Sequence, residues 1–194
     1  MIGRERLQRS RCRWFFFSSL LSSFWLFVGT IHATTCDIYE AGHTPCVAAH
    51  SVIRALYQNY RGPLYALRRS SDNRTIDVGV EKTGGFANVS AHETFCANTS
   101  CVFLTIYDQS NHGNHLSQGP PGGAHWKKDL LANAAAGPIE IGGRTFYGLR
   151  MDPPSGYRND NTTGIATGDE AETIYFVVNG THFNDRVRGP SSLS

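Results

Sequence analysis

The chain has 194 residues, with 18 Lys or Arg against 16 Asp or Glu, and its formal net charge is +2. Five of the arginines lie within the first 13 residues, so without residues 1–33, which also include Glu5, the charge falls to −2. Such a chain lacks the basic surplus of a nucleic-acid-binding protein, and we expect no DNA or RNA partner. The 161 residues after position 33 are enough for one domain with a buried core.

Residues 1–33 have the pattern of a cleavable secretory signal peptide. The arginine-rich start is followed by an apolar run over residues 14–28 whose only polar members are serines. Fifteen residues are too few for a helix that spans a bilayer, which needs roughly 20. We expect cleavage after Ala33, secretion to the extracellular space and no membrane association afterwards. An uncleaved signal anchor is the alternative.

Four cysteines follow the expected cleavage point, because Cys12 lies in the leader. An even number of cysteines in an exported chain indicates two disulfides. Of the three possible pairings, the sequence favours the local one, which joins Cys36 to Cys46 and Cys96 to Cys101 and closes two short loops. A structural zinc site is the alternative, but spacings of 10 and 5 residues do not match its usual paired ligands.

Asn-X-Ser/Thr sequons also suit an exported chain. Such sequons arise by chance as well, so we expect only some to be glycosylated, and those on exposed loops. The five candidates are Asn73, Asn88, Asn98, Asn161 and Asn179.

The first expected element is a short N-terminal helix over residues 45–60. Thr44 suits the N-cap position and Pro45 the first helical position. Apolar residues then recur at spacings of three and four until Gly62 and Pro63 end the pattern. They are Ala49, Val52, Ile53, Leu56, Tyr57 and Tyr60.

A change of period then predicts a β-hairpin. Residues 64–68 and 75–80 have the composition of strands, and residues 70–73 between them are typical of a turn. Ser90 and Glu93 next form a capping-box pair, which predicts a single helical turn before Cys96.

Further strands are expected in the second half of the chain. Residues 102–107 are apolar on both faces, which predicts a central, covered strand. Residues 139–141 and 145–149 flank Gly142-Gly143 and predict a second hairpin. Residues 173–178 form the last predicted strand. Long polar connections between these strands favour a mainly β sandwich with little helix over a βαβ protein.

Most polar clusters have a plain structural interpretation. His112 and His115 near Asp108 suggest a metal site, but in a loop of Asn, Ser and Gly we expect solvated turn residues and no metal. His43 and His50 are expected to pack or cap. The acidic cluster of Asp169, Glu170 and Glu172 is expected to be a solvated edge. The sequence has no nucleophile-elbow serine and no glycine-rich phosphate loop, and we expect no cofactor.

The loop over residues 107–123 follows the strongest predicted strand directly. A long polar loop on a rigid strand is a common place for a binding surface. Its Tyr107-Asp108-Gln109-Ser110 start and the glycine-asparagine turn after it resemble lectin-like β-sandwich domains.

A series of short motifs narrows this resemblance. The chain resembles the catalytic domain of the secreted α-L-arabinofuranosidases of glycoside hydrolase family 54, from Cys36 to about Asn184. The motifs, in order, are Cys36-Asp37-Ile38-Tyr39, Thr44-Pro45-Cys46-Val47-Ala48-Ala49-His50-Ser51, Arg54-Ala55-Leu56-Tyr57, Gly62-Pro63-Leu64-Tyr65, Phe95-Cys96-Ala97, Ile106 to Ser110, Gly113-Asn114-His115-Leu116, Pro120-Pro121-Gly122-Gly123, Gly156-Tyr157-Arg158-Asn159, Ala166-Thr167-Gly168-Asp169 and Gly180-Thr181-His182.

The resemblance implies a lectin-like (concanavalin-like) β-sandwich, here incomplete, and the same two local disulfides. It implies retaining hydrolysis of terminal arabinofuranose from arabinan and arabinoxylan, and hence a role in hemicellulose degradation. The expected partner is an arabinose-containing plant polysaccharide, and the complete protein is expected to be a monomer. Retention needs two carboxyl groups about 5 Å apart.

The chain departs from the family after Asn184. There the family continues into a vicinal cysteine pair, the nucleophilic glutamate and the acid/base aspartate, and usually an arabinose-binding β-trefoil module. This chain has a divergent tail over residues 185–194. No residue matches either catalytic carboxylate, so none is assigned. We therefore divide the chain into a signal peptide, residues 1–33, the N-terminal part of an arabinofuranosidase catalytic domain, residues 34–184, and the tail.

Three functional hypotheses follow. The favoured one is a truncated arabinofuranosidase that is inactive by itself. The second is a secreted, non-catalytic carbohydrate-binding module that acts through residues 107–123. The third is an active hydrolase that uses carboxylates such as Asp108 or Asp169 in new roles.

Overall fold

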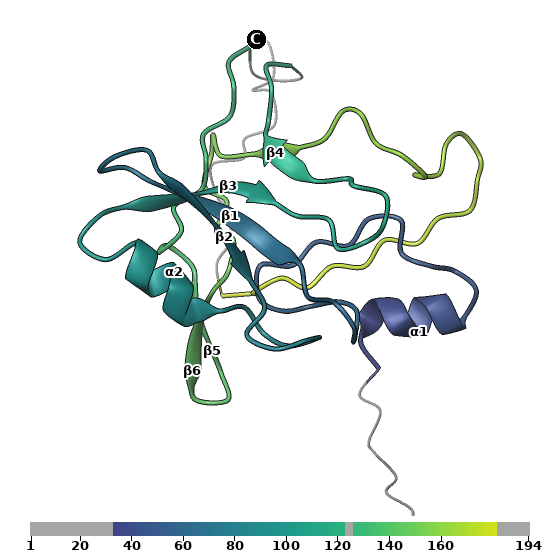
Figure 1. Cartoon of the computed structure of the whole chain (residues 1–194). Helices are drawn as coiled ribbons and strands as arrows, with labels where there is room; N and C mark the ends of the chain where they lie inside the picture. Colours follow the sequence, from purple (N-terminus) through teal and green to yellow (C-terminus); the bar gives the residue numbers. More distant parts are fainter. Residues whose placement is uncertain (1–32, 123–125, 182–194) are drawn as a thin grey trace, which may run out of the picture. The chain divides into compact units, whose positions relative to one another are not determined.

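A five-stranded antiparallel sheet in the order β2-β1-β3-β4-β7 carries the fold (Figure 1). The computed structural model describes residues 33–122 and 126–181, so the expected signal peptide, except Ala33, and the expected tail lie outside the described residues. The strands of this sheet are β1 (Pro63–Arg69), β2 (Thr75–Gly79), β3 (Cys101–Ile106), β4 (Leu116–Gln118) and β7 (Tyr157–Arg158).

The remaining elements are one hairpin and two short helices. The hairpin of β5 (Pro138–Ile141) and β6 (Arg144–Tyr147) forms a separate two-stranded sheet. Its turn residues, Gly142 and Gly143, have φ values of 59° and 75°, a conformation in which a side chain would be strained. The helices are α1 (Thr35–Ala41) and α2 (Val89–Phe95), and α2 lies beside the β2 edge of the sheet (Figure 1). The prediction of a mainly β protein is confirmed.

The core is centred on β1. Leu64, Tyr65, Ala66 and Leu67 are consecutive and all buried, so both faces of this strand are covered. Phe103 from β3 is fully buried and meets the Tyr65 ring edge to face, with centroids 5.0 Å apart. The predicted first hairpin is β1 and β2, and the predicted central strand is β3, which pairs with β1 on one side and β4 on the other.

The predicted helix over residues 45–60 is wrong. Of the residues expected on its apolar face, Ala49 and Val52 are buried and the other four are half-buried, but on an irregular backbone. Partners distant in the sequence take up the backbone groups that a helical ladder would have used. Asp108 accepts from the Ala49 N–H, and Gln109 Oε1 accepts from the Leu56 N–H, both at 2.7 Å.

The N-terminal helix of this protein is α1 instead. Thr34 caps it in a reciprocal capping box with Asp37, so the true cap lies ten residues before the expected Thr44. The second helix, α2, begins one residue before the predicted Ser90. Its N-cap is Asn88, whose side chain accepts a hydrogen bond from the Ala91 N–H.

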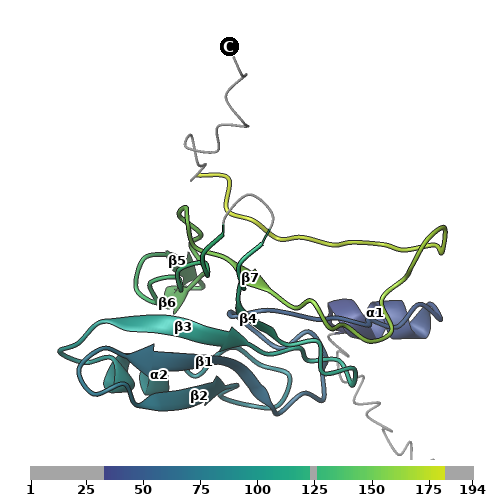
Figure 2. The same cartoon turned by 90° about the horizontal axis from the view of Figure 1, so that it is seen from above.

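Residues 173–178 do not form the predicted strand. A strand needs a neighbouring strand to pair with its backbone N–H and C=O groups. Within residues 33–122 and 126–181, no strand pairs with this segment. Figure 2 shows it, in yellow, running apart from the five-stranded sheet. Its apolar side chains are exposed, with Phe176 at 76% and Val178 at 82%. An exposed apolar segment of this length is typical of an interaction surface.

The four cysteines form the two expected local disulfides. Cys36 in α1 is bonded to Cys46, and Cys96, the C-cap of α2, is bonded to Cys101 at the start of β3. The first bridge joins α1 to the irregular segment that was expected to be helical. The second fixes α2 against the sheet.

A histidine lies in the core without a charged partner inside it. His92 of α2 is 2% exposed, its Nδ1 lies 2.9 Å from the Tyr65 hydroxyl, and its ring stacks on Tyr147 with centroids 4.4 Å apart. Burial lowers the pKa of His92 to about 4 from 6.5. The folded protein therefore holds this imidazole neutral at neutral pH.

We expect the fold to lose stability as the pH falls from about 6.5 to about 4. Over that range the unfolded chain binds a proton at His92 and the folded chain does not, so unfolding is favoured by about 3 kcal/mol in total. Urea denaturation at several pH values measures the loss. His92→Gln keeps an acceptor for Tyr65 but cannot titrate, so its free energy of unfolding should change less with pH. His43→Gln, at an exposed site, is the matched control. Identical pH profiles for His92→Gln and the parent protein would contradict this expectation.

None of the helices within residues 33–122 and 126–181 has the length and apolar character needed to cross a membrane.

Candidate functional site

The loop after β3 contains a buried carboxylate. Asp108 is 5% exposed and accepts from three backbone N–H groups, those of Ala49 at 2.7 Å, Ser110 at 2.9 Å and Asn114 at 2.9 Å. The Ser110 hydroxyl also donates to it, at 2.6 Å. One oxygen receives the Ala49 and Ser110 amides, and the other receives the Asn114 amide and the hydroxyl.

Two neighbouring amide side chains extend this arrangement. Gln109 accepts from the Leu56 N–H and donates to the Arg54 carbonyl. Asn114 is 2% exposed and donates to the carbonyls of Val47 and Thr163, both at 2.8 Å. We call Asp108, Gln109, Ser110 and Asn114 the Asp108 network. It ties the loop to residues 47–56 on one side and to residue 163 on the other.

The electrostatics of Asp108 suit a structural role. Burial raises the pKa of its carboxyl, but the hydrogen bonds from Ser110, Ala49 and Asn114 outweigh burial and leave the pKa below its ordinary value. A general acid needs a raised pKa, and a nucleophile needs free access to substrate. Asp108 has neither property, because its oxygens are buried and already accept four hydrogen bonds.

The nearby histidines do not converge on a metal site. His112 is exposed, and the Nδ1 atom of His115 accepts a hydrogen bond from the Asp108 backbone N–H at 3.0 Å. His50 Nε2 lies 2.7 Å from the Asn114 carbonyl, so this residue packs against the loop as expected. No three His, Cys, Asp or Glu side chains come together as metal ligands in the part of the chain that the structure describes.

The acidic cluster lies on the surface. Asp169, Glu170 and Glu172 are all exposed, and Glu170 accepts from the Thr167 N–H at 2.8 Å. That bond closes a local turn. The exposed location matches the solvated edge expected from the sequence.

The loop therefore faces in two directions. The Asp108 network faces the protein, whereas Asn111, His112, His115 and Ser117 are exposed to solvent. The side chains that make the loop look most like a binding site are thus mainly those that hold it in place.

Four of the five sequons lie at exposed positions. Asn73 and Asn98 have φ values of 58°, a turn conformation that asparagine tolerates well. Asn161 and Asn179 are exposed in irregular segments. Asn88 differs from them because it is half-buried and caps α2.

Sequence reasoning missed the roles of Gln109 and Asn114. The signal was present as a run of polar residues, Tyr107 to Ser110, that directly follows a buried strand. A buried polar side chain has to be paired, so such residues form networks wherever the chain folds over them.

The antiparallel sheet, the separate hairpin and the loop fixed by the Asp108 network define a β-sandwich domain of the lectin-like class. Residues 35–188 match the family model described as "Alpha-L-arabinofuranosidase B, catalytic". The chain belongs to this family.

Curated relatives and solved structures agree with this assignment. Alpha-L-arabinofuranosidase B of Aspergillus kawachii is 53% identical over 160 residues, which cover 80% of this chain and 32% of that protein. Alpha-L-arabinofuranosidase B of Penicillium canescens is 48% identical over 161 residues, covering 80% and 34%. The crystal structure of an arabinofuranosidase complexed with arabinofuranosyl-α-1,2-xylobiose has a TM-score of 0.68 and 52% identity, and the match covers 71% of this chain and 29% of that one. The chain thus spans about a third of the length of the curated relatives it matches.

Proposed function

We propose that this chain forms the N-terminal part of the catalytic domain of a secreted, retaining α-L-arabinofuranosidase. The family match over residues 35–188 is the observation that carries the proposal. A solved relative binds arabinofuranosyl-α-1,2-xylobiose, which supports arabinose-substituted plant polysaccharides as the substrate class. The nucleophilic glutamate and acid/base aspartate would come from the segment that follows residue 184 in the family.

In this proposal the described residues have a positioning role. The five-stranded sheet forms the rigid part, and the Asp108 network fixes the loop after β3 against it. Such a rigid support is what a glycosidase requires, since its two carboxyl groups must be held about 5 Å apart around the sugar.

A chimeric protein tests the proposal. Residues 1–184 of this chain are joined to the segment that follows the equivalent position in the Aspergillus kawachii relative. We expect the chimera to be secreted and to release arabinose from 4-nitrophenyl α-L-arabinofuranoside and from arabinoxylan. The same chimera with the nucleophilic glutamate of that segment changed to glutamine is the inactive control. A folded chimera without activity would contradict the proposal.

We further propose that export removes residues 1–33. The fold supports a mature start at Thr34, which is 7% exposed, whereas Ala33 is exposed. The Thr34 backbone nitrogen donates to Asp37 Oδ2 at 3.0 Å, and its hydroxyl lies 2.5 Å from the Leu56 carbonyl. After cleavage that nitrogen would be a charged ammonium beside the Asp37 carboxylate, whose negative charge suits the first turn of α1 and offsets the repulsion between the ammonium and the helix dipole.

N-terminal sequencing of the protein secreted by a fungal host should therefore begin at Thr34. A start one or two residues earlier would leave the ammonium away from Asp37. Retention of residues 1–33 on a cell-associated protein would instead support the signal-anchor alternative.

A further inference from the structure

A shallow groove lies between α2 and the β1–β2 hairpin, with a volume of about 510 Å³. It is lined by Arg69, Arg74, Asn88, Ser90, Thr94 and Phe95, among others. Asn88 and Ser90 are the first and third residues of a sequon. A possible site of glycan attachment thus forms part of the wall of the groove.

The side chain of Asn88 can cap α2 and carry a glycan at the same time. Its Oδ1 accepts the Ala91 N–H at 3.1 Å, whereas its Nδ2 donates to none of the described residues. N-glycosylation replaces one hydrogen on Nδ2 and leaves Oδ1 unchanged. The helix therefore keeps its N-cap after modification.

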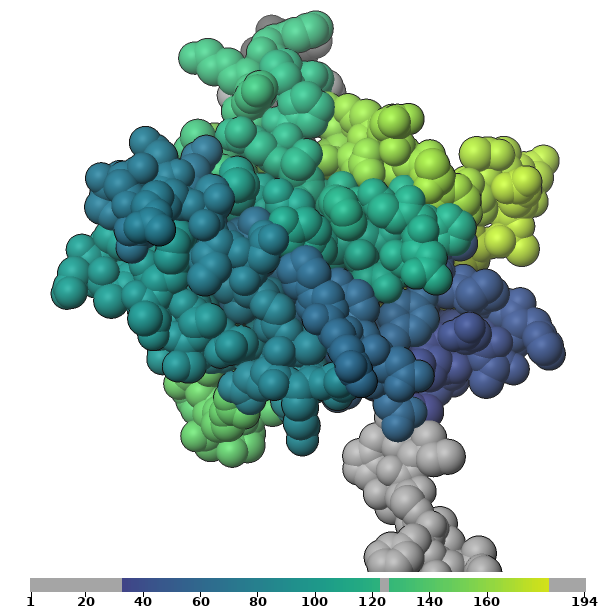
Figure 3. Space-filling view, viewed as in Figure 1, coloured from purple at the N-terminus to yellow at the C-terminus, as the bar shows by residue number. Residues whose placement is uncertain are grey.

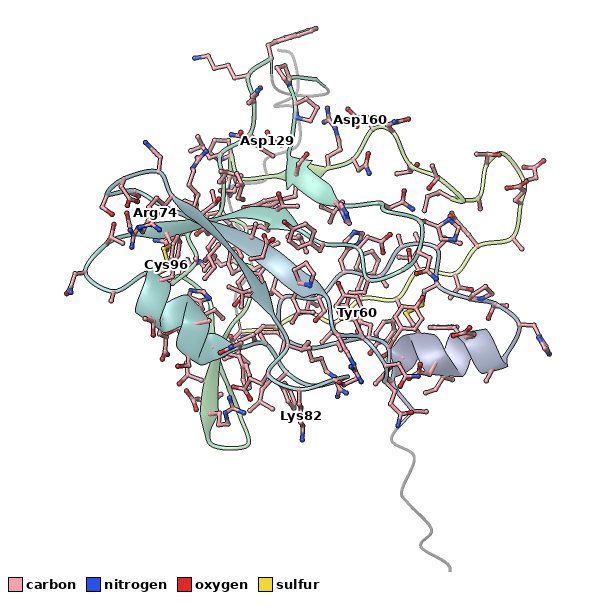
Figure 4. The ribbon with its side chains drawn as sticks, viewed as in Figure 1. Tyr60, Arg74, Lys82, Cys96, Asp129 and Asp160 are labelled. Carbon is pink, nitrogen blue, oxygen red and sulfur yellow. A yellow bond between two sulfur atoms is a disulfide. The ribbon has the colours of Figure 1, made fainter. Side chains whose placement is uncertain are left out.

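The groove has the chemistry of a small sugar site. The Phe95 ring provides an apolar wall, with the Arg69 guanidinium 5.0 Å from its centroid. Arg69 is paired with Asp72, but the Arg74 guanidinium makes no hydrogen bond to any residue that the structure describes. Figure 4 shows Arg74 near Cys96, at the C-terminal end of α2. Its donors, with the hydroxyls of Ser90 and Thr94, suit the oxygens of a sugar.

We propose that Asn88 carries an N-glycan and that its first N-acetylglucosamine lies in this groove. The inference rests on the proposed export, because the glycan is transferred in the secretory pathway from a lipid-linked oligosaccharide pyrophosphate. The transfer forms the bond between Nδ2 and sugar C1, breaks the bond from C1 to the pyrophosphate oxygen, and releases one amide proton and the lipid pyrophosphate. The exposed sequons at Asn73, Asn98, Asn161 and Asn179 line no part of this groove.

The experiment uses the full chain secreted from yeast, with the other four sequons removed by Asn→Asp substitutions. Glycopeptide mass spectrometry should find Asn88 modified. Three forms are then melted: the untreated protein, protein trimmed by an endoglycosidase that leaves the first N-acetylglucosamine, and protein treated with an amidase that removes the whole glycan. The amidase leaves Asp at position 88, which still caps the helix.

We expect the untreated and trimmed forms to melt together, and the amidase-treated form to melt about 2 to 4 °C lower. In Arg74→Ala this difference should shrink, because the groove has lost a donor to the sugar. Ser90→Thr preserves the sequon and should show the same melting difference as the single-sequon protein. Equal melting temperatures for all three forms of the single-sequon protein would overturn the groove contact.

An unmodified Asn88 in a chain that is glycosylated at its other sequons would overturn the whole inference while leaving the export proposal intact. A chain that is neither secreted nor glycosylated at any sequon would overturn both. The parent chain with all five sequons is therefore analysed alongside the single-sequon protein.

Discussion

A polypeptide of these 194 residues is expected to release no measurable arabinose from 4-nitrophenyl α-L-arabinofuranoside. A retaining glycosidase forms a covalent glycosyl-enzyme, which requires a carboxylate nucleophile on one side of the anomeric carbon and a proton donor on the other. The family resemblance assigns neither group to a residue of this chain. The buried Asp108 cannot replace them, since its oxygens are enclosed by hydrogen bonds from the protein.

The expected difference is large. General acid catalysis alone contributes about a hundred- to ten-thousandfold, whereas complete enzymes reach at least about a millionfold. The chimera completed with the relative's segment should therefore be at least about a hundredfold more active than the 194-residue polypeptide. If the polypeptide alone turns over substrate and Asp169→Asn abolishes the turnover, the hypothesis of new carboxylate roles replaces the present one.

The second large effect concerns Asp108 itself. Asp108→Ala is expected to destabilise the protein by about 4 kcal/mol, because it leaves the amides of Ala49, Ser110 and Asn114 buried without an acceptor. Asp108→Asn should cost about 2 kcal/mol, since the amide oxygen can still accept two of the hydrogen bonds. Urea denaturation at pH 7 measures both values.

The control for this series is Asp169→Asn, at an exposed carboxylate. Its effect should lie within about 0.5 kcal/mol of zero. A series in which Asp108→Ala and Asp169→Asn have the same stability as the parent protein would show that the Asp108 network does not hold the fold together.

The sequence predicted those parts of the fold whose information is local. The β1–β2 and β5–β6 hairpins each combine strand-forming residues with a turn that fixes their register, and both are present. The strand β3 is apolar enough to be recognised without its neighbours. The short strands β4 and β7 have only 3 and 2 residues, too few for any period to be visible.

The two failures have a common physical cause. Residues 45–60 have the spacing of an amphipathic helix, but a helix satisfies its own backbone, and here Asp108 and Gln109 offer stronger partners from far along the chain. Residues 173–178 have the composition of a strand, but a strand forms only with a neighbour. Figure 3 shows the stretch of chain just before this last segment, in yellow-green, on the molecular surface. Both outcomes depend on long-range contacts that a local pattern does not contain.

The candidate site was predicted in location only. The sequence singled out the loop after β3, because a polar run follows an apolar strand there, and the structure places the Asp108 network in this loop; that the loop binds a ligand stays a prediction. It did not show that Asp108 and Asn114 face inward, since burial is set by the segments that cross over the loop. Those segments include Val47 and Thr163, which lie 67 and 49 residues away from Asn114 in the sequence.

These separations bear on the order in which the molecule folds. Closing loops of that length costs conformational entropy before any contact is gained, so we expect the Asp108 network to form after the transition state, whereas the β1–β2 hairpin can form early. Asp108→Asn should then accelerate unfolding and leave the refolding rate nearly unchanged. Stopped-flow kinetics in urea would show this as a shift of the unfolding limb alone, and a slower refolding limb would place the network in the folding nucleus instead. With the expected shift of the unfolding limb alone, the loop after β3 sets the lifetime of the native state more than the speed at which it is reached.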